Sequence, residues 1–355
     1  MVRIGIAGIG FMGRIHFLAS QRLSGAKVTD RSDASGTGYF DSVAEQWIPE
    51  YLALAGGSRD WAALLPSVLS PCEAAGTVGP AAIASLGLDS DSSDIVVAAG
   101  GGDQHAAYLG LGLTDGDQYI GIGTSGVIAT SSRMPVYDTK GMVDGVCDLT
   151  GGYLPLVSTL NAARVSAVAA RLLGTDLAGL AELALDAGDT VGPVLAPFLD
   201  GERKPDRPHA RGALADVTSH TTRAELARAF VEGPLLSLMS GRDQLLGCGM
   251  RLDGAAVAVG GGARSPATLQ LLADLLDDEI VVLDADDATA RGACVQAAAV
   301  ASGADVAGLT DLAKSWQPAV RQRVSAARHG RDLEALRNRW AELAASPVLD
   351  SGVEA

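Results

Sequence analysis

An acidic residue that could do chemistry follows a short apolar run and three glycines in the first third of the chain. Ile95 to Ala99 form a short apolar run that predicts a strand, Gly100 to Gly102 leave space beside its end, and Asp103 begins an alanine-rich helical pattern. The positive end of a helix keeps a carboxylate ionised. An ionised carboxylate at this place suits a catalytic base, and the alternative is a plain N-cap.

A second stretch, QYIGIGTSGVIATSS, predicts two strands joined by a turn of small residues. A turn of this composition can direct backbone N–H groups and two hydroxyls at one phosphate. The turn consists of Gly123, Thr124, Ser125 and Gly126. Its alternative interpretation is an ordinary hairpin turn.

A third stretch, AAVAVGGGARSPATLQLLADLL, predicts a buried strand, a glycine turn and a helix. Ser265 can act as the N-cap of that helix and Pro266 as its first residue. Glycines here let a flat ligand lie against the backbone, and the alternative is a tight strand-to-helix connection. The turn consists of Gly260, Gly261, Gly262, Ala263 and Arg264.

The chain opens with a pattern typical of dinucleotide binding. A predicted strand, VRIGIAG, leads into glycines 8, 10 and 13 with GxGxxG spacing, then a predicted helix, then a strand KVTD that ends at Asp30. Asp30 could accept a hydrogen bond from a ribose hydroxyl. The alternative is that this opening supplies only an edge strand and a helix.

The residues after Asp30 do not continue a Rossmann domain, which needs several more β-α units. A stretch rich in Gly, Ser and Asp follows, and then helix-leaning segments at Val43–Ala55 and Trp61–Leu69. Near the end of the chain, Asp311 to Ala345 predict helices, of which Arg331–Leu343 is amphipathic. These helices are expected to cover the second domain.

The amino-acid composition of the chain limits the binding partners that we expect. The formal net charge of the 355 residues is −15, which disfavours nucleic acid and anionic membranes. Four widely separated cysteines and an opening without a signal-peptide pattern favour a reduced, cytoplasmic protein. Backbone N–H groups and a metal ion can still bind phosphate locally in an acidic protein.

Six blocks, in order, resemble successive motifs of the FGGY carbohydrate kinases. They are TDRSDASGTGYFD, VVAAGGGDQHAAYLGLGL, YIGIGTSGV, PFLDGERKPDRPHARG, RAELARAFVEG and VAVGGGARSP. The resemblance runs from Asp30 to the last helices and is strongest toward members that phosphorylate D-xylulose.

This resemblance implies an α/β fold of the actin-like ATPase (ribonuclease H-like) type, with two domains closing on a cleft. It implies ATP and Mg²⁺ as cofactors and a small sugar, a pentulose, as the binding partner. It leaves open whether the chain forms a homodimer. By the resemblance, Asp103 is the catalytic base and contacts the sugar together with Gln104. The glycine turns at 123–126 and 260–264 would bind ATP, and the loop with Arg203, Arg207 and Arg211 would lie near the nucleotide. The alternative is that these three arginines are only solvated charges.

The sequence departs from the family at its beginning. The family's early D-x-G-T block, which cradles phosphate and organises Mg²⁺, has no counterpart, so the metal ligand is unknown. The first 29 residues instead resemble the start of a glucose-fructose oxidoreductase-like protein. We therefore expect a truncated first domain, with a Rossmann-like fragment at 1–29, a kinase N-terminal remnant at 30–115 and a C-terminal domain at 116–345.

Three functions follow as hypotheses. The first is a xylulose-phosphorylating kinase whose activity is impaired or absent because of the departure at its start. The second is a nucleotide-binding remnant without catalysis. The third is a nicotinamide-dependent oxidoreductase, suggested by glycines 8, 10 and 13 and by Asp30.

Overall fold

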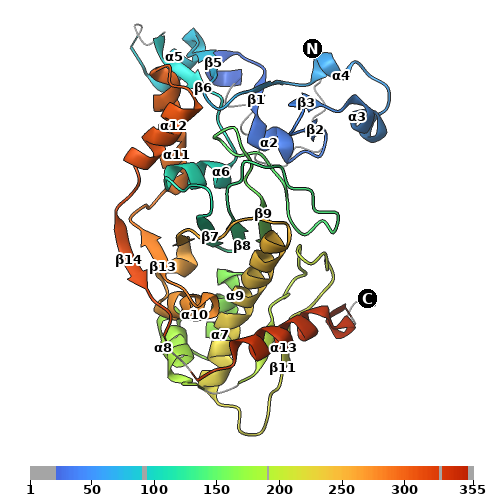
Figure 1. The fold of residues 1–355 in the computed structure, drawn as a ribbon, viewed down its shortest axis with the longest axis vertical. Helices are drawn as coiled ribbons and strands as arrows, with labels where there is room; N and C mark the ends of the chain where they lie inside the picture. The colour runs from blue at the N-terminus through green and yellow to red at the C-terminus, as the bar shows by residue number, and fades with distance from the viewer. Residues whose placement is uncertain (1–20, 90–93, 190–191, 328–329, 351–355) are drawn as a thin grey trace.

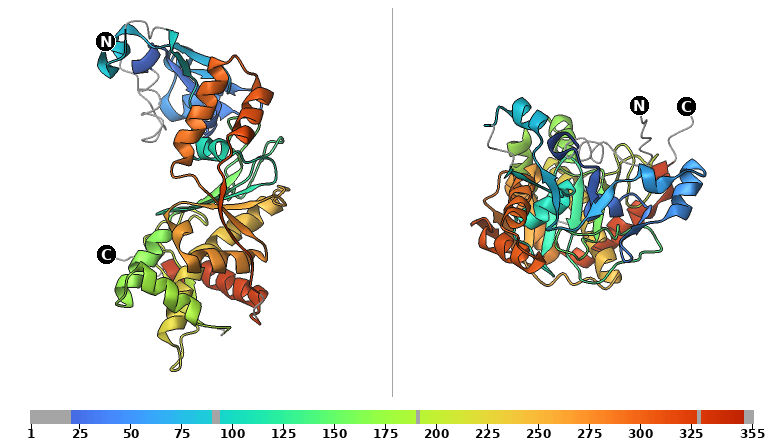
Figure 2. Two further views of the ribbon diagram at one scale, coloured as in Figure 1. Left: turned by 90° about the vertical axis from the view of Figure 1, so that its left-hand side faces the viewer. Right: turned by 90° about the horizontal axis from the view of Figure 1, so that it is seen from above.

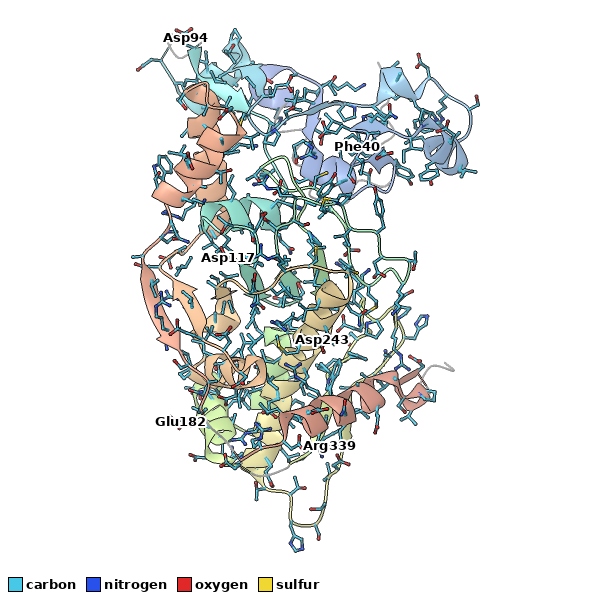
Figure 3. All side chains as sticks on the ribbon, viewed as in Figure 1. Phe40, Asp94, Asp117, Glu182, Asp243 and Arg339 are labelled. Atoms are coloured by element: carbon cyan, nitrogen blue, oxygen red, sulfur yellow. The ribbon has the colours of Figure 1, made fainter. Side chains whose placement is uncertain are left out.

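The computed structural model describes residues 21–89, 94–189, 192–327 and 330–350. These residues form two lobes stacked along the long axis of the molecule (Figures 1 and 2). The upper lobe in Figure 1 combines the early elements with two late helices, and the lower lobe is built on a sheet. Asp117 lies between the lobes (Figure 3), where its carboxylate accepts hydrogen bonds from Thr114 N and Ala255 N at 2.8 and 2.9 Å.

A six-stranded mixed sheet forms the centre of the lower lobe. Its order is β14-β13-β12-β7-β8-β9, in which β12 pairs in parallel with β7 and β13 while the other pairs are antiparallel. The strands are β7 (Gln118–Ile122), β8 (Gly126–Ala129), β9 (Leu156–Thr159), β12 (Ala256–Val259), β13 (Ile280–Leu283) and β14 (Val320–Val324). The predicted strands on both sides of the 123–126 turn and before Gly260 are therefore confirmed.

Helices and a short hairpin cover one face of this sheet with a large apolar core. They are α7 (Ala163–Leu172), α8 (Leu177–Asp186), α9 (Arg223–Gly247), α10 (Pro266–Leu276), α13 (Leu333–Ala345) and the hairpin β10 (Val194–Ala196)–β11 (Ala213–Ala215). Helix α9 begins with a capping box between Thr222 and Glu225. A buried bidentate ion pair joins Glu232 of α9 to Arg331, with N–O distances of 2.5 and 2.9 Å, and so anchors the entry to α13.

The upper lobe contains short elements. In chain order these are β1 (Val28–Asp30), α2 (Arg31–Ser35), β2 (Phe40–Asp41), β3 (Gln46–Trp47), α3 (Pro49–Gly56), α4 (Trp61–Leu64), β4 (Ser67–Leu69), β5 (Ala74–Thr77), α5 (Pro80–Leu86), β6 (Val96–Ala98) and α6 (Asp103–Gly110). Strands β1 and β4 pair in parallel, whereas β2–β3 and β5–β6 are antiparallel. Two helices from the other end of the chain complete the lobe: α11 (Ala288–Ala301) and α12 (Val306–Ser315).

Helices α6 and α11 touch backbone to backbone. A Cβ added at Gly292 of α11 would lie 1.8 Å from the carbonyl oxygen of Ala106, and one added at Gly110 of α6 would lie 2.2 Å from that of Ala288. Farther along α11, the side-chain amide of Gln296 donates to Gly100 O at 3.0 Å and accepts from Gly100 N at 3.1 Å. Helix α11 therefore holds both α6 and the glycine segment that precedes it.

The structure corrects two predictions of secondary structure. The segment Val43–Ala55 is helical only in α3, because Gln46 and Trp47 pair with Asp41 and Phe40 in a hairpin, and Trp61–Leu69 ends in strand β4. The C-terminal segment from Asp311 includes strand β14, and α12 packs on α6 in the upper lobe. The sequence of β14, VRQRV, is exposed and charged because β14 is an edge strand. It therefore shows no hydrophobic pattern that would predict a strand.

The glycine motif at positions 8, 10 and 13 lies outside the described residues. The strand predicted at KVTD is confirmed as β1. Asp30 at its end is 3% exposed and caps α2, accepting from Ser32 N at 2.7 Å. This carboxylate is therefore committed to a helix cap, which contradicts its expected contact with a ribose.

None of the described helices has the length and hydropathy needed to cross a membrane.

We predict that Gly292→Ala lowers the free energy of unfolding by at least about 1–3 kcal/mol, because the new methyl group has no room against the α6 backbone. The matched control is Gly247→Ala in α9, where no atom lies within 4 Å of an added Cβ. There the substitution should be neutral or gain up to about 1 kcal/mol, since alanine favours helix. Urea unfolding measures both, and equal effects at the two positions would refute the close packing.

Candidate active site

A cavity of about 410 Å³ lies where the sheet meets the upper lobe. Four segments line it: the start of α6, the β7–β8 turn, the β12–α10 turn and the β13–α11 connection. Eight residues selected from the sequence share this cavity: Asp103, Gln104, Gly123, Ser125, Gly260, Gly261, Ala263 and Arg264. The other three selected residues, Thr124, Gly126 and Gly262, do not line it.

Asp103 is the first residue of α6 and is exposed toward the cavity. Gly102 occupies the N-cap position, so Asp103 does not have the plain N-cap role. Its carboxylate accepts from the backbone of Gln104 at 2.8 Å, and its carbonyl oxygen accepts from Thr289 Oγ1 of α11 at 3.1 Å. Asp103 is thus held by α6 and by the neighbouring helix α11, while most of its carboxylate remains available to a ligand.

The β7–β8 turn presents Gly123 and Ser125 to the cavity. The carbonyl oxygens of Gly123 and Thr124 accept from Ala163 N and Ala162 N at 2.8 and 3.2 Å, so the start of α7 holds this turn. Gly126 already belongs to β8 and is buried. The turn joins β7 and β8 as a tight hairpin, which was the alternative to a phosphate-binding turn. It also faces the cavity.

The β12–α10 turn is a 3-10 helix, η2 (Gly261–Arg264), introduced by Gly260 with φ 93°. Ser265 caps α10, accepting from Thr268 N at 3.3 Å, and Pro266 is its first residue; both predictions are confirmed. No atom lies within 4 Å of a Cβ added at Gly261, so this residue leaves open space along the cavity wall. Gly262 instead turns toward Ile122.

Sequence reasoning missed the fourth wall. It consists of Asp286, Asp287 and Thr289 around the start of α11, with Arg321 of β14 beside them. Asp287 caps α11, accepting from Ala290 N at 2.9 Å. A strand, a short connection and a helix follow one another here as they do before Asp103, and that shared order is the signal that could have identified this wall.

Tyr119 of β7 also lines the cavity. Burial, with a smaller contribution from the negative charge of Asp103, raises the pKa of Tyr119 to about 12. Tyr119 is therefore a neutral phenol across the physiological pH range.

The loop PFLDGERKPDRPHARG does not line this cavity. Arg207, whose side chain is 12% exposed, donates to Ser346 O at 2.7 Å and pairs with Asp350, while Arg203 donates to Ser158 Oγ at 3.1 Å. The contacts of Arg207 fasten the segment that follows α13, so this side chain has a structural role. Within the described ranges, no group of three or more His, Cys, Asp or Glu side chains is arranged to hold a metal ion.

Comparison with known proteins places this geometry in a family. The C-terminal domain of the FGGY family of carbohydrate kinases matches residues 119–301, and the N-terminal domain matches residues 6–110. The N-terminal match therefore includes most of the 1–29 segment.

Curated relatives include two xylulose kinases. The one from Streptomyces coelicolor is 38% identical over 86% of this chain and 60% of its own length. The one from Streptomyces rubiginosus is 36% identical over 96% of this chain and 67% of its own length. The chain thus spans about three fifths to two thirds of these relatives.

Among solved structures, xylulose kinase from Bifidobacterium adolescentis superposes with a TM-score of 0.77 at 33% identity, covering 92% of this chain and 67% of that one. The two-lobed α/β architecture is accordingly that of the actin-like ATPase sugar kinases, as the sequence motifs imply. From matched domains, relatives and fold together, we conclude that this chain belongs to the FGGY family of carbohydrate kinases.

Proposed function

We propose that the protein transfers the γ-phosphoryl group of ATP to D-xylulose. The observation that carries this proposal is the shared cavity, in which Asp103 lies with residues of the β7–β8 and β12–α10 turns. A carboxylate opposite backbone turns is the arrangement that phosphoryl transfer to a hydroxyl needs. We propose D-xylulose as the sugar because the relatives are named xylulose kinase.

ATP would lie along the glycine turns. Gly261 leaves the backbone open to a flat base or ribose, and Arg264 adds a positive charge. Gly123 and Ser125 would contact the phosphates, because backbone N–H groups bind anions even in a protein with a net charge of −15. We extend this role to Thr124, Gly126, Gly262 and Ala263 as parts of the same turns.

Asp103 would act as the general base. The sugar hydroxyl attacks the γ-phosphorus, its proton passes to the Asp103 carboxylate, and the bond from phosphorus to the bridging oxygen breaks to release ADP. Gln104, beside Asp103 in the cavity, would orient the sugar by hydrogen bonds. The contacts of Asp103 with Gln104 N and Thr289 hold the base in place during this step.

Mg²⁺ is expected to accompany ATP, since it binds through one or two carboxylates plus substrate phosphates rather than a full protein cage. The cavity provides Asp103, Asp286 and Asp287 for such a role. When bound, Mg²⁺ would neutralise charge on the phosphates.

For the chain as a whole we propose the division at residues 1–29, 30–115 and 116–345. We also propose a cytoplasmic location, in keeping with four free cysteines. A homodimer is compatible with the proposed activity, which uses one chain's cavity.

We predict that Asp103→Asn lowers kcat by about 100- to 10,000-fold, because the amide cannot take the proton. ADP release is measured with MgATP and D-xylulose, and ATP affinity, measured by calorimetry, should stay unchanged. Asp253→Asn, at an exposed acid outside the cavity, is the matched control and should turn over normally. Unchanged turnover of Asp103→Asn would refute the assigned base.

Two binding measurements on the wild type distinguish the other hypotheses. ATP binding without release of ADP would favour a non-catalytic nucleotide-binding protein. NADH binding in equilibrium dialysis would favour an oxidoreductase.

We predict that Gly261→Val weakens ATP binding by about tenfold or more, the equivalent of about 1.4 kcal/mol, because the side chain enters the space left for the nucleotide. The unfolding temperature should not change, since no atom crowds the position. Gly330→Val, at an equally open position outside the cavity, is the control. Unchanged ATP affinity in Gly261→Val would place the nucleotide elsewhere.

Gly260→Ala, by contrast, should unfold at a lower temperature than the wild type, because φ is 93° and Ile122 O would lie 2.7 Å from the new methyl group.

A further inference from the structure

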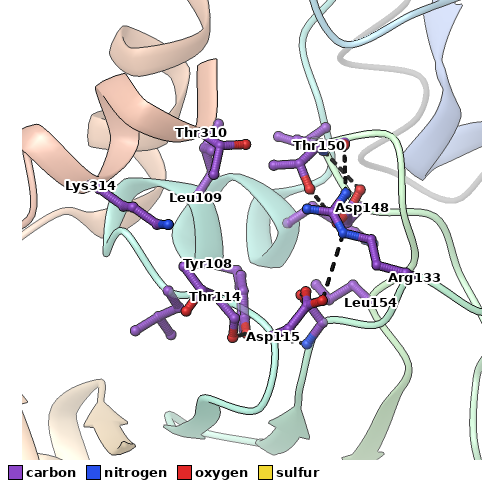
Figure 4. Close-up of a pocket in the computed structure, with 14 residues that line it drawn as sticks. Tyr108, Leu109, Thr114, Asp115, Arg133, Asp148, Thr150, Leu154, Thr310 and Lys314 are labelled. Carbon is purple, nitrogen blue, oxygen red and sulfur yellow. Dashed lines mark hydrogen bonds and ion pairs between the residues drawn. The ribbon is translucent and has the colours of Figure 1, made fainter. Parts of the chain in front are cut away.

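A second cavity, of about 260 Å³, lies beside α6 and shares no lining residue with the first (Figure 4). His105, Tyr108 and Leu109 of α6 form one side of it. Helix α12 and the loops at 113–115, 131–133 and 148–150 form the rest. Helix α6 therefore separates this cavity from the one that contains Asp103.

Two cations face the cavity from different elements. Lys314 extends from α12 and Arg133 from the opposite wall (Figure 4). Within the described ranges the Lys314 ammonium makes no hydrogen bond or ion pair with another residue. Arg133 pairs with Asp115 at 3.6 Å and donates to Thr150 O at 3.3 Å, which leaves further guanidinium N–H groups available.

The two carboxylates of the lining are already engaged. Asp148 accepts from Thr150 N, Thr150 Oγ1 and Gly152 N at 2.8, 2.6 and 2.7 Å. Asp115 accepts from Ser131 Oγ at 2.5 Å in addition to its pairing with Arg133. Neutral groups hold the Asp148 carboxylate by hydrogen bonds and Asp115 pairs with Arg133, so Lys314 is the lining cation without a carboxylate partner among the described residues.

The hydroxyl groups of the lining donate into the protein and keep lone pairs for a ligand. Thr310 Oγ1 donates to Val306 O at 2.9 Å, Thr150 Oγ1 to Asp148, and Thr114 Oγ1 to Asp117 at 3.1 Å. A hydroxyl that donates inward can still accept from a ligand O–H group. This wall is therefore suited to a ligand that carries several hydroxyls.

His105 is the unexplained polar side chain of this cavity. Neither ring nitrogen has a hydrogen-bond partner among the described residues, although both are buried. Burial lowers the pKa of His105, against the opposing charges of Asp30, Asp148 and Asp103, and so favours the neutral ring. Because both ring nitrogens are enclosed by protein, His105 lines the cavity without presenting a hydrogen-bonding group to a ligand.

We propose that this cavity is a second binding site, for a small polyhydroxylated anion such as a sugar phosphate or a sugar acid. The anionic group would lie between Lys314 and Arg133, and the hydroxyls would contact Thr150 and Thr310. The site is independent of the proposed kinase activity. Because α6 lines both cavities, the ligand would bind against the helix that begins with Asp103.

Calorimetry with the full chain tests this site without ATP. The probes are D-ribose 5-phosphate, D-ribonate and inorganic phosphate. At least one of the first two should bind, and which one binds identifies the anionic group. Lys314→Met should weaken that binding about tenfold or more, whereas Lys314→Arg and the exposed control Lys140→Met should not.

Gly261→Val serves as a second control, because it obstructs the first cavity only. Binding that survives in Gly261→Val but not in Lys314→Met assigns the probe to the second cavity. Three results would overturn the proposal: no binding of either polyol anion, equal binding to wild type and Lys314→Met, or inorganic phosphate binding as tightly as the polyol anions. None of them bears on phosphoryl transfer, which the ADP assay measures separately.

Discussion

The contact between α6 and α11 is the constraint on which the arrangement of the molecule depends. Their backbones meet at Gly110 and Gly292, where no side chain fits, and Gln296 extends the contact to Gly100. Since Asp103 begins α6 and Asp287 caps α11, this contact fixes two walls of the larger cavity relative to each other. The position of the proposed base is thus set by the backbone packing of α6, and the hydrogen bond from Gln104 N adds to it.

The same strand–turn–helix connection forms several sides of the larger cavity. A strand ends, a few small or polar residues follow, and a helix begins; this occurs before α6, α10 and α11. Helix starts and open turns concentrate backbone N–H groups, which favour anions. An acidic protein can in this way hold phosphates with few basic side chains, and Arg264 and Arg321 are the lining residues that carry positive charge.

Much of the site could be predicted from sequence because its signals are local. A glycine turn between an apolar strand and a helix is visible at 260–264, and so is the acid after Gly100–Gly102. The β13–α11 wall was missed because its connection is acidic rather than glycine-rich, and β14 because an edge strand carries charged residues. Asp30 was misassigned because a GxGxxG spacing does not reveal that the following acid is buried as a helix cap. The second cavity could not be predicted, since α12 and the loops at 131–133 and 148–150 meet only in three dimensions.

The late helices also bear on how the protein reaches its native state. The small core around α6 joins Ala106 and Leu109 to Val295, Leu309 and Ala313, residues about two hundred positions apart. During synthesis, the first half of the chain emerges from the ribosome before its packing partners exist. The upper lobe must therefore wait for α11 and α12, whereas the sheet strands β7, β8 and β9 can pair as soon as they emerge. Contacts so distant in sequence make maturation of this lobe a slow, late event.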